Sequence, residues 1–299
     1  MSSPIPLGNA GIPEALRLIG AFRRNEYPDP SSLSWTISAK SGGGKTSLLC
    51  SYPNAALLDL EGGTFLCPDT TAIRIFCPVL NDDELTPQLK EPDPSLRRPS
   101  ATSLRTAAQT LLDMAQQPGN PIRTVCIDSA ELLQLMLTSE LERGWGESAG
   151  QRGQSAWRDI NKVCSAFIQQ FQNVGYSVAV AVHLKDEFKD MKGGTSVFTK
   201  PTITDGFVEA LKKRTDFTLQ IVAGSEFDPA KGESVPRFNV LTESTAQRKG
   251  NYGLKRRVAL PAVIEDIPLV GGMSKIFAVC NDAIDNLRNT YGQGESSNG

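Results

Sequence analysis

The chain has 299 residues, of which 39% are hydrophobic and 21% charged, a composition typical of a globular protein with a large core. Its formal net charge of −2 excludes a strongly basic surface over the whole molecule. No apolar run reaches the length of a membrane span and the first residues lack a signal pattern, so we expect a cytoplasmic protein without membrane contact. Six cysteines without C-x-x-C pairs are expected to be reduced core residues.

The hydrophobic pattern predicts strands that alternate with helices along most of the chain. Such alternation is typical of an α/β fold in which helices cover both faces of a mostly parallel central sheet. A proline- and charge-rich stretch, 81–100, is predicted to be an exposed excursion. The expected helices are 12–24, 45–51, 103–117, 130–142 and about 155–174, the expected strands are 33–38, 55–60, 73–79, 123–129 and 176–183, and three shorter strands that could pair antiparallel are expected after residue 215, at 217–223, 237–243 and 255–260.

Residues 39–47 read AKSGGGKTS and lie between a predicted strand and a predicted helix. Consecutive glycines let the backbone curl until several N–H groups point at one anion, and the start of the helix adds partial positive charge. In this motif Lys45 would reach the β- and γ-phosphates of ATP, and Thr46 would offer its hydroxyl to Mg²⁺. Ala39 departs from the usual first glycine, and a glycine-rich turn before an ordinary helix is the alternative. The predicted ATP-binding residues are Ala39, Lys40, Ser41, Gly42, Gly43, Gly44, Lys45, Thr46 and Ser47.

Three polar residues follow or end predicted strands, where ligands of open α/β sheets bind. Asp128 ends TVCID and is the candidate for holding Mg²⁺ beside Thr46. Glu61 follows LLDL and could activate the water that attacks the γ-phosphate, although it could also only cap a turn. His183, the single histidine, could hydrogen-bond the γ-phosphate or have a structural role.

The order of AKSGGGKTS, LLDLEGG, TVCIDSAELL, VAVAVH and LKKRTDFTLQIV resembles the RecA-like P-loop ATPases over residues 31–260. It is most similar to phage AAA-type nucleotide-binding proteins of the single-strand annealing recombinase type. The resemblance implies an N-terminal helical segment (1–30), a RecA-like ATPase domain (31–288) with short antiparallel strands towards its C-terminal end, and a disordered tail (289–299). It also implies that Glu61 activates water, that Asp128 serves magnesium, and that His183 couples the nucleotide state to a DNA-binding loop.

The same resemblance places DNA-binding loops at about 143–154 and 184–205. Lysines can neutralise phosphates and aromatic rings can stack on bases, which suits single-stranded DNA. Acidic residues dilute the charge of the second loop, so a solvated loop without a ligand is the alternative. The candidates are Lys185, Phe188, Lys189, Lys192, Phe198 and Lys200 in the second loop, and Arg143 and Arg152 in the first.

Lys255 and Arg257 are similar in spacing to a basic finger that related ATPases insert into a neighbour's active site. The alternative is a basic strand edge that resists aggregation.

The leading expectation is an ATPase that assembles into a ring or filament of identical chains on single-stranded DNA and promotes annealing or strand exchange. A nucleotide-dependent interaction module with little turnover and a helicase-type motor are the other possibilities.

Overall fold

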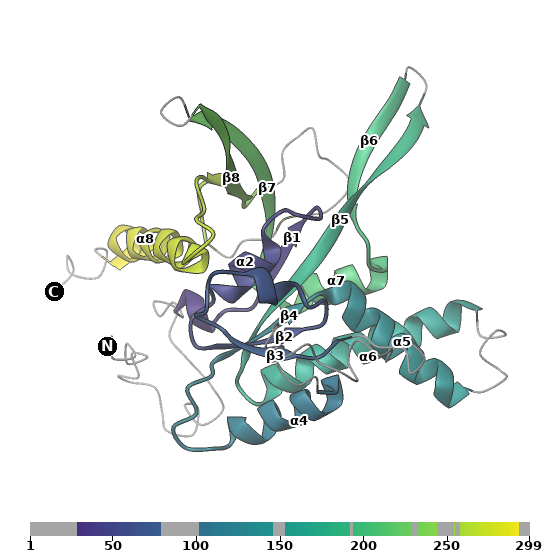
Figure 1. Ribbon diagram of the computed structural model, residues 1–299. Helices are drawn as coiled ribbons and strands as arrows, with labels where there is room; N and C mark the ends of the chain where they lie inside the picture. Colours follow the sequence, from purple (N-terminus) through teal and green to yellow (C-terminus); the bar gives the residue numbers. More distant parts are fainter. Residues whose placement is uncertain are drawn as a thin grey trace.

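The computed structural model describes residues 29–78, 102–145, 153–191, 194–228, 232–243, 254 and 258–292 (Figure 1). The helix expected over 12–24, the excursion 81–100 and the last seven residues lie outside this part of the chain. What is described is one central sheet with helices on both of its faces, which confirms the expected α/β class.

Six parallel strands form the sheet, and an antiparallel pair extends it at one end. The order is β3-β2-β4-β5-β1-β7-β8-β9, and β6 pairs with β5 outside this row. The parallel strands are β3 (Ile73–Phe76), β2 (Ala55–Asp59), β4 (Thr124–Asp128), β5 (Ser177–Met191), β1 (Trp35–Ala39) and β7 (Phe217–Asp228), and the antiparallel ones are β8 (Glu233–Leu241), β9 (Val263–Ile264) and β6 (Gly194–Pro201).

The central strands are apolar on both sides, and successive residues enter two different hydrophobic cores. In β4, Val125 and Ile127 belong to one core and Cys126 to the other. Period-2 alternation of side chains explains why a strand covered on both faces has a continuous apolar sequence. Helices α4 (Leu104–Ala115), α5 (Ala130–Trp145), α6 (Gly153–Asn173) and α7 (Asp205–Arg214) supply the first core, and α2 (Lys45–Cys50) and α8 (Gly272–Gly292) the second.

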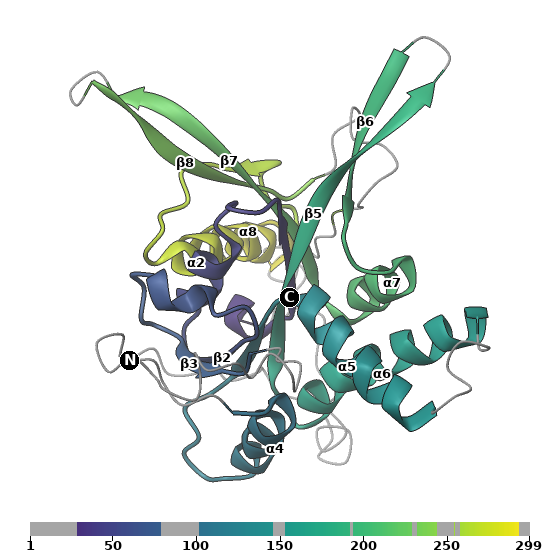
Figure 2. The same cartoon turned by 45° about the vertical axis from the view of Figure 1, so that its right-hand side comes forward.

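Two long hairpins leave the same end of the sheet and diverge like arms (Figures 1 and 2). One is formed by β5 and β6, and the other by β7 and β8. The segment 184–205, expected to be a polar loop, is therefore mostly a two-stranded ribbon. Its sequence does not alternate between polar and apolar residues as a half-buried strand does. Of the strand expected over 255–260, residues 258–260 are not in a strand, and β9 forms slightly later.

The described helices agree with the sequence pattern in most places and extend it in others. Helix α5 continues to Trp145, so Arg143 lies in a helix and not in the expected glycine-rich loop. Helices α7 and α8 were not predicted, and α8 runs to Gly292.

All six cysteines are free thiols, five of them buried, as expected. Within the described residues, no helix combines the length and the apolar character needed to cross a membrane.

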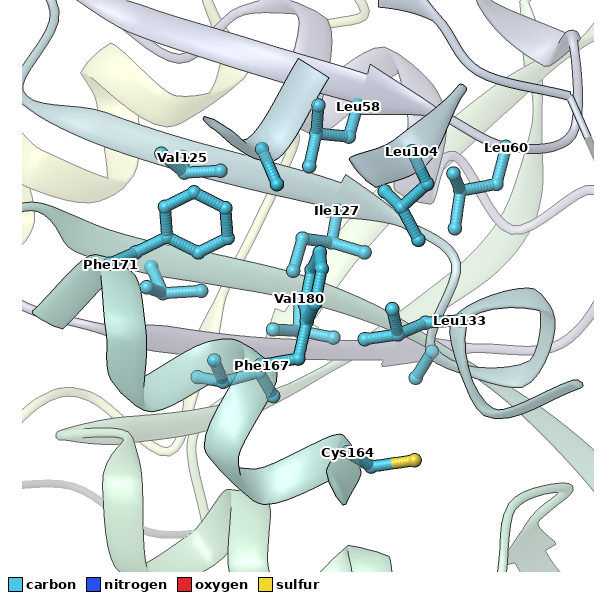
Figure 3. Packing of buried hydrophobic residues seen from close by; sticks show 14 of the residues in the cluster. Leu58, Leu60, Leu104, Val125, Ile127, Leu133, Cys164, Phe167, Phe171 and Val180 are labelled. Atoms are coloured by element: carbon cyan, nitrogen blue, oxygen red, sulfur yellow. The ribbon is translucent and has the colours of Figure 1, made fainter. Parts of the chain in front are cut away.

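Phe171, on α6, belongs to the first core and lies beside Val125 of β4 (Figure 3). It is completely buried, and its ring lies 5.5 Å from that of Phe167 and 6.5 Å from that of Tyr176. We predict that Phe171→Ala lowers the free energy of unfolding by about 3–5 kcal/mol, because a cavity replaces the ring. Leu135→Ala is the control: its side chain is 52% exposed, so a change within about 0.5 kcal/mol is expected in the same urea titration.

Candidate nucleotide site

The glycine-rich segment curls tightly between β1 and α2. Gly42 and Gly44 have φ of 71° and 85°, a region that L side chains rarely adopt. A Cβ on Gly43 would lie only 2.7 Å from the Cβ of Ala39 and 2.9 Å from the carbonyl oxygen of Lys40. Ala39 is the last residue of β1 and has no positive φ, so this position does not need glycine. The loop therefore has the geometry of a phosphate cradle despite its departure from the motif.

Lys45 begins α2 and folds back over the loop. Its side chain is buried, and Nζ donates to the carbonyl oxygens of Ala39 and Lys40, each at 3.3 Å. Burial lowers the pKa of Lys45, while the carboxylates of Asp128, Glu61 and Glu131 act in the opposite direction. The ammonium group thus lies at the centre of the loop, where it would contact an anion bound there.

Thr46 and Asp128 come together as the motif predicts. The Thr46 hydroxyl donates to Asp128 Oδ2 at 2.6 Å, and Asp128 Oδ1 is buried without a hydrogen-bond partner. Burial raises the pKa of Asp128 to about 6 against the hydrogen bond from Thr46, and nearby carboxylates add to the rise. Mg²⁺ in nucleotide sites takes one or two protein oxygens and completes its shell with phosphates and water. The two side chains fit such an ion, because the buried carboxylate has an oxygen without a hydrogen-bond partner and Lys45 offsets the surrounding negative charge only in part.

Asp59 supports the turn that carries Glu61, a role that the sequence did not indicate. This completely buried carboxylate accepts hydrogen bonds from the Gly62 N–H at 2.7 Å and from the Thr64 hydroxyl at 2.5 Å. The turn directs Glu61 towards Ser129, whose hydroxyl donates to Glu61 Oε1 at 2.6 Å. Glu61 is therefore held beside the end of β4, next to Asp128.

His183 lies next to the loop because β1 and β5 pair in register, with Ala39 opposite His183. Its Nδ1 is 3.5 Å from Glu61 Oε1 and 3.3 Å from Glu131 Oε2. The adjacent Glu131 carboxylate raises the pKa of His183, and burial works against this rise. The structure thus brings together Lys45, Thr46, Glu61, Asp128 and His183. Glu131 was missed, although its place in the first turn after β4 is a usable signal.

The candidates for nucleic-acid contact are distributed along the first hairpin. Lys185 and Lys200 are opposite each other at its base, and Lys200 Nζ lies 2.8 Å from Glu187 Oε2. Phe188 and Lys189 lie on β5, and Phe198 lies on β6. The other candidates, Arg152, Lys192, Lys255 and Arg257, are outside the described residues.

Two hollows meet at Trp157 on α6, which is 54% exposed. The hollow of about 560 Å³ runs from this ring to Lys185 and Lys200 at the base of the hairpin, and two carboxylates, those of Glu131 and Asp205, also line it. The other, of about 680 Å³, lies between α6 and α7 and is lined by Arg158, Lys162, Lys213, Arg214 and one carboxylate, that of Glu209. Together they form a surface in which an exposed aromatic ring lies between basic side chains.

The close contact at Gly43 gives a direct test of the cradle. We predict that Gly43→Ala weakens Mg-ATP binding by about tenfold or more, because the added methyl group displaces the loop. Isothermal titration calorimetry measures the affinity. Gly224→Ala is the matched control, since a Cβ there has no atom within 4 Å and its backbone φ is not positive. An unchanged affinity in Gly43→Ala would mean that this loop does not bind the phosphates.

Asp128 gives a second test, this one of charge. Its pKa in the folded state, about 6, exceeds the ordinary 3.8, so its ionisation opposes folding increasingly between these values and fully above pH 6. At pH 7 without magnesium, Asp128→Asn should therefore melt at or above the temperature of the wild type, while magnesium should no longer tighten ATP binding. Asp159→Asn, at a partly exposed position on α6, is the control. A lower melting temperature for Asp128→Asn would contradict this assignment of the buried charge.

The comparison with protein families agrees with this geometry. A family model described as an AAA domain matches residues 31–249, a span that contains the glycine-rich loop, Glu61, Asp128 and His183. No curated protein sequence matches the chain. Helix α8 and the Lys255 and Arg257 pair lie beyond the match. Because the match covers well over half of the 299 residues, the chain belongs to this AAA domain family of P-loop ATPases.

Proposed function

We propose that this protein is a Mg²⁺-dependent ATPase that acts on single-stranded DNA in recombination or replication, by annealing or strand exchange. The observation that carries the proposal is the contact of His183 with Glu61, at 3.5 Å. It joins the candidate water-activating carboxylate to the strand that continues into the first hairpin, where the candidate DNA contacts lie. Nucleotide chemistry and a nucleic-acid surface would then share one structural element.

In the proposed reaction the glycine-rich loop and Lys45 hold the phosphates, and Thr46 and Asp128 hold Mg²⁺, which neutralises phosphate charge when bound. Glu61 accepts a proton from the water whose oxygen attacks the γ-phosphorus, as the bond from that phosphorus to the ADP oxygen breaks. Ser129 restricts Glu61 through its hydrogen bond at 2.6 Å. Such positioning matters because phosphoryl transfer depends mainly on alignment and electrostatics.

The surface around Trp157 supports single-stranded DNA as the partner. An exposed ring can stack on a base whatever the sequence, while Lys185, Lys200 and the basic side chains between α6 and α7 can neutralise phosphates. The net charge of −2 makes a local basic surface necessary for any such binding. Binding through this surface would depend strongly on salt.

Assembly into a ring or filament of identical chains is part of the proposal. Next to the turn that carries Glu61, Leu66 is 93% exposed, and Ile73 on the neighbouring strand β3 is 55% exposed. Large apolar side chains exposed near a site support coverage by another chain. Lys255 and Arg257 of that chain would then supply positive charge to the transferring phosphate in trans.

ATP turnover measured with and without single-stranded DNA tests the proposal. We expect DNA to raise the turnover of the wild type. Lys45→Ala should abolish turnover, and Glu61→Gln should lower it by a factor on the order of 100 or more while ATP remains bound, because the base is lost but the cradle is intact. Glu140→Gln, at an exposed position on α5, should behave like the wild type.

Two results would contradict the proposal. Saturable ATP binding with negligible phosphate release, even when DNA is supplied, would support a nucleotide-dependent interaction module instead. Turnover that DNA does not change would remove the DNA-linked role and leave an ATPase of another kind.

A further inference from the structure

Glu131 lies beside the candidate nucleotide site but has no role in the proposed reaction. It lies in the first turn of α5, three residues after Asp128, and its side chain is only 19% exposed. Burial acts to raise the pKa of Glu131, but contacts with the His183 ring and the Thr202 hydroxyl outweigh burial, and the pKa is below its ordinary value. Glu131 is therefore an ionised carboxylate that is kept inside the protein by specific partners.

One oxygen of Glu131 ties together the two strands of the first hairpin at their base. Oε1 accepts a hydrogen bond from the backbone N–H of His183 on β5 at 2.7 Å. The same oxygen accepts one from the hydroxyl of Thr202, which directly follows β6, at 2.5 Å. Thr202 N–H also donates to the His183 carbonyl at 3.0 Å. A shift of the hairpin would therefore move the groups that donate hydrogen bonds to Glu131.

The other oxygen of Glu131 faces the catalytic side of the cluster. Oε2 is buried, has no hydrogen bond of regular geometry, and lies 3.3 Å from His183 Nδ1. That nitrogen is also 3.5 Å from Glu61 Oε1. A single ring nitrogen thus lies between two carboxylates, one attached to the hairpin base and one expected to activate water. The position of Glu131 decides how the ring meets Glu61.

We propose that Glu131 is a positioning residue that transmits the position of the β5–β6 hairpin to Glu61 through His183. The inference rests on the proposed ATPase function and adds a route by which a ligand on the hairpin regulates it. The route has three steps: Thr202 moves with the hairpin, Glu131 follows through its shared oxygen, and the His183 ring changes its contact with Glu61. The hydrogen bonds of Glu131 go to His183 and Thr202, and Glu131 acts on Lys45 of the cradle through its charge.

The test compares ATP turnover of full-length variants with and without a single-stranded oligonucleotide. In Glu131→Ala we expect the DNA-stimulated kcat to fall by about tenfold or more, with KM for ATP within about twofold, because orientation is lost while binding is kept. Glu131→Gln retains an acceptor for His183 N–H and Thr202, so its kcat should recover to within about threefold of the wild type. Glu142→Ala, at an exposed position on the same helix, is the control.

Thr202→Val tests the link to the hairpin, since a methyl group of similar size replaces the hydroxyl that donates to Glu131. Thr202 also lines the hollow beside Lys185 and Lys200, so the affinity for the oligonucleotide is measured as well and should be unchanged. We expect its turnover without DNA to match the wild type and its stimulation by DNA to be reduced. A melting curve identifies any variant that fails to fold, and Thr202→Val tests the route even if Glu131→Ala does not fold. Wild-type stimulation in Thr202→Val, or a rise in KM without a fall in kcat in Glu131→Ala, would overturn the inference. If the wild type itself shows no DNA-stimulated turnover, the proposed function fails instead.

Discussion

The parallel pairing of β1 with β5 on one side and β7 on the other sets the position of the glycine-rich loop. β1 ends at Ala39, and the glycine-rich loop begins there. Both neighbours continue beyond that point into the two hairpins. The loop therefore lies between the bases of two arms, and the register that sets Ala39 opposite His183 also fixes the distance between the loop and the first arm.

A second constraint is electrostatic. Asp128, Glu61 and Glu131 gather around the ammonium group of Lys45, and Asp59 lies close to Asp128 at the end of β2. Each of these carboxylates has different hydrogen-bond partners. Asp59 is satisfied by its own turn, and Glu131 by the hairpin base. Asp128 keeps one oxygen without a partner. A site that is short of positive charge in this way favours a metal-bound nucleotide.

The sequence was sufficient for most of the central sheet because each buried strand is a short apolar run with turn residues at its ends. It also predicted the close approach of Thr46 to Asp128, since the carboxyl ends of parallel strands share one edge. The first hairpin was not predicted from the sequence pattern. The stretch from Lys185 to Lys200 mixes charged residues with single apolar ones, and it lacks the regular alternation by which a half-buried strand is recognised. Glu131 was missed for another reason: its partners, His183 and Thr202, are 52 and 71 residues away. Contacts of that kind become visible only when the chain is folded.

Strand β5 has a mechanical consequence of its own. It runs without interruption for 15 residues, from Ser177 to Met191, so its first half is a member of the central sheet and its second half is an arm in the open. At about 3.3 Å per residue, the strand is about 50 Å long. It leaves β1 at His183 and pairs with β6 from Leu184 onwards. A displacement of its free end would therefore reach the candidate nucleotide site along one continuous strand.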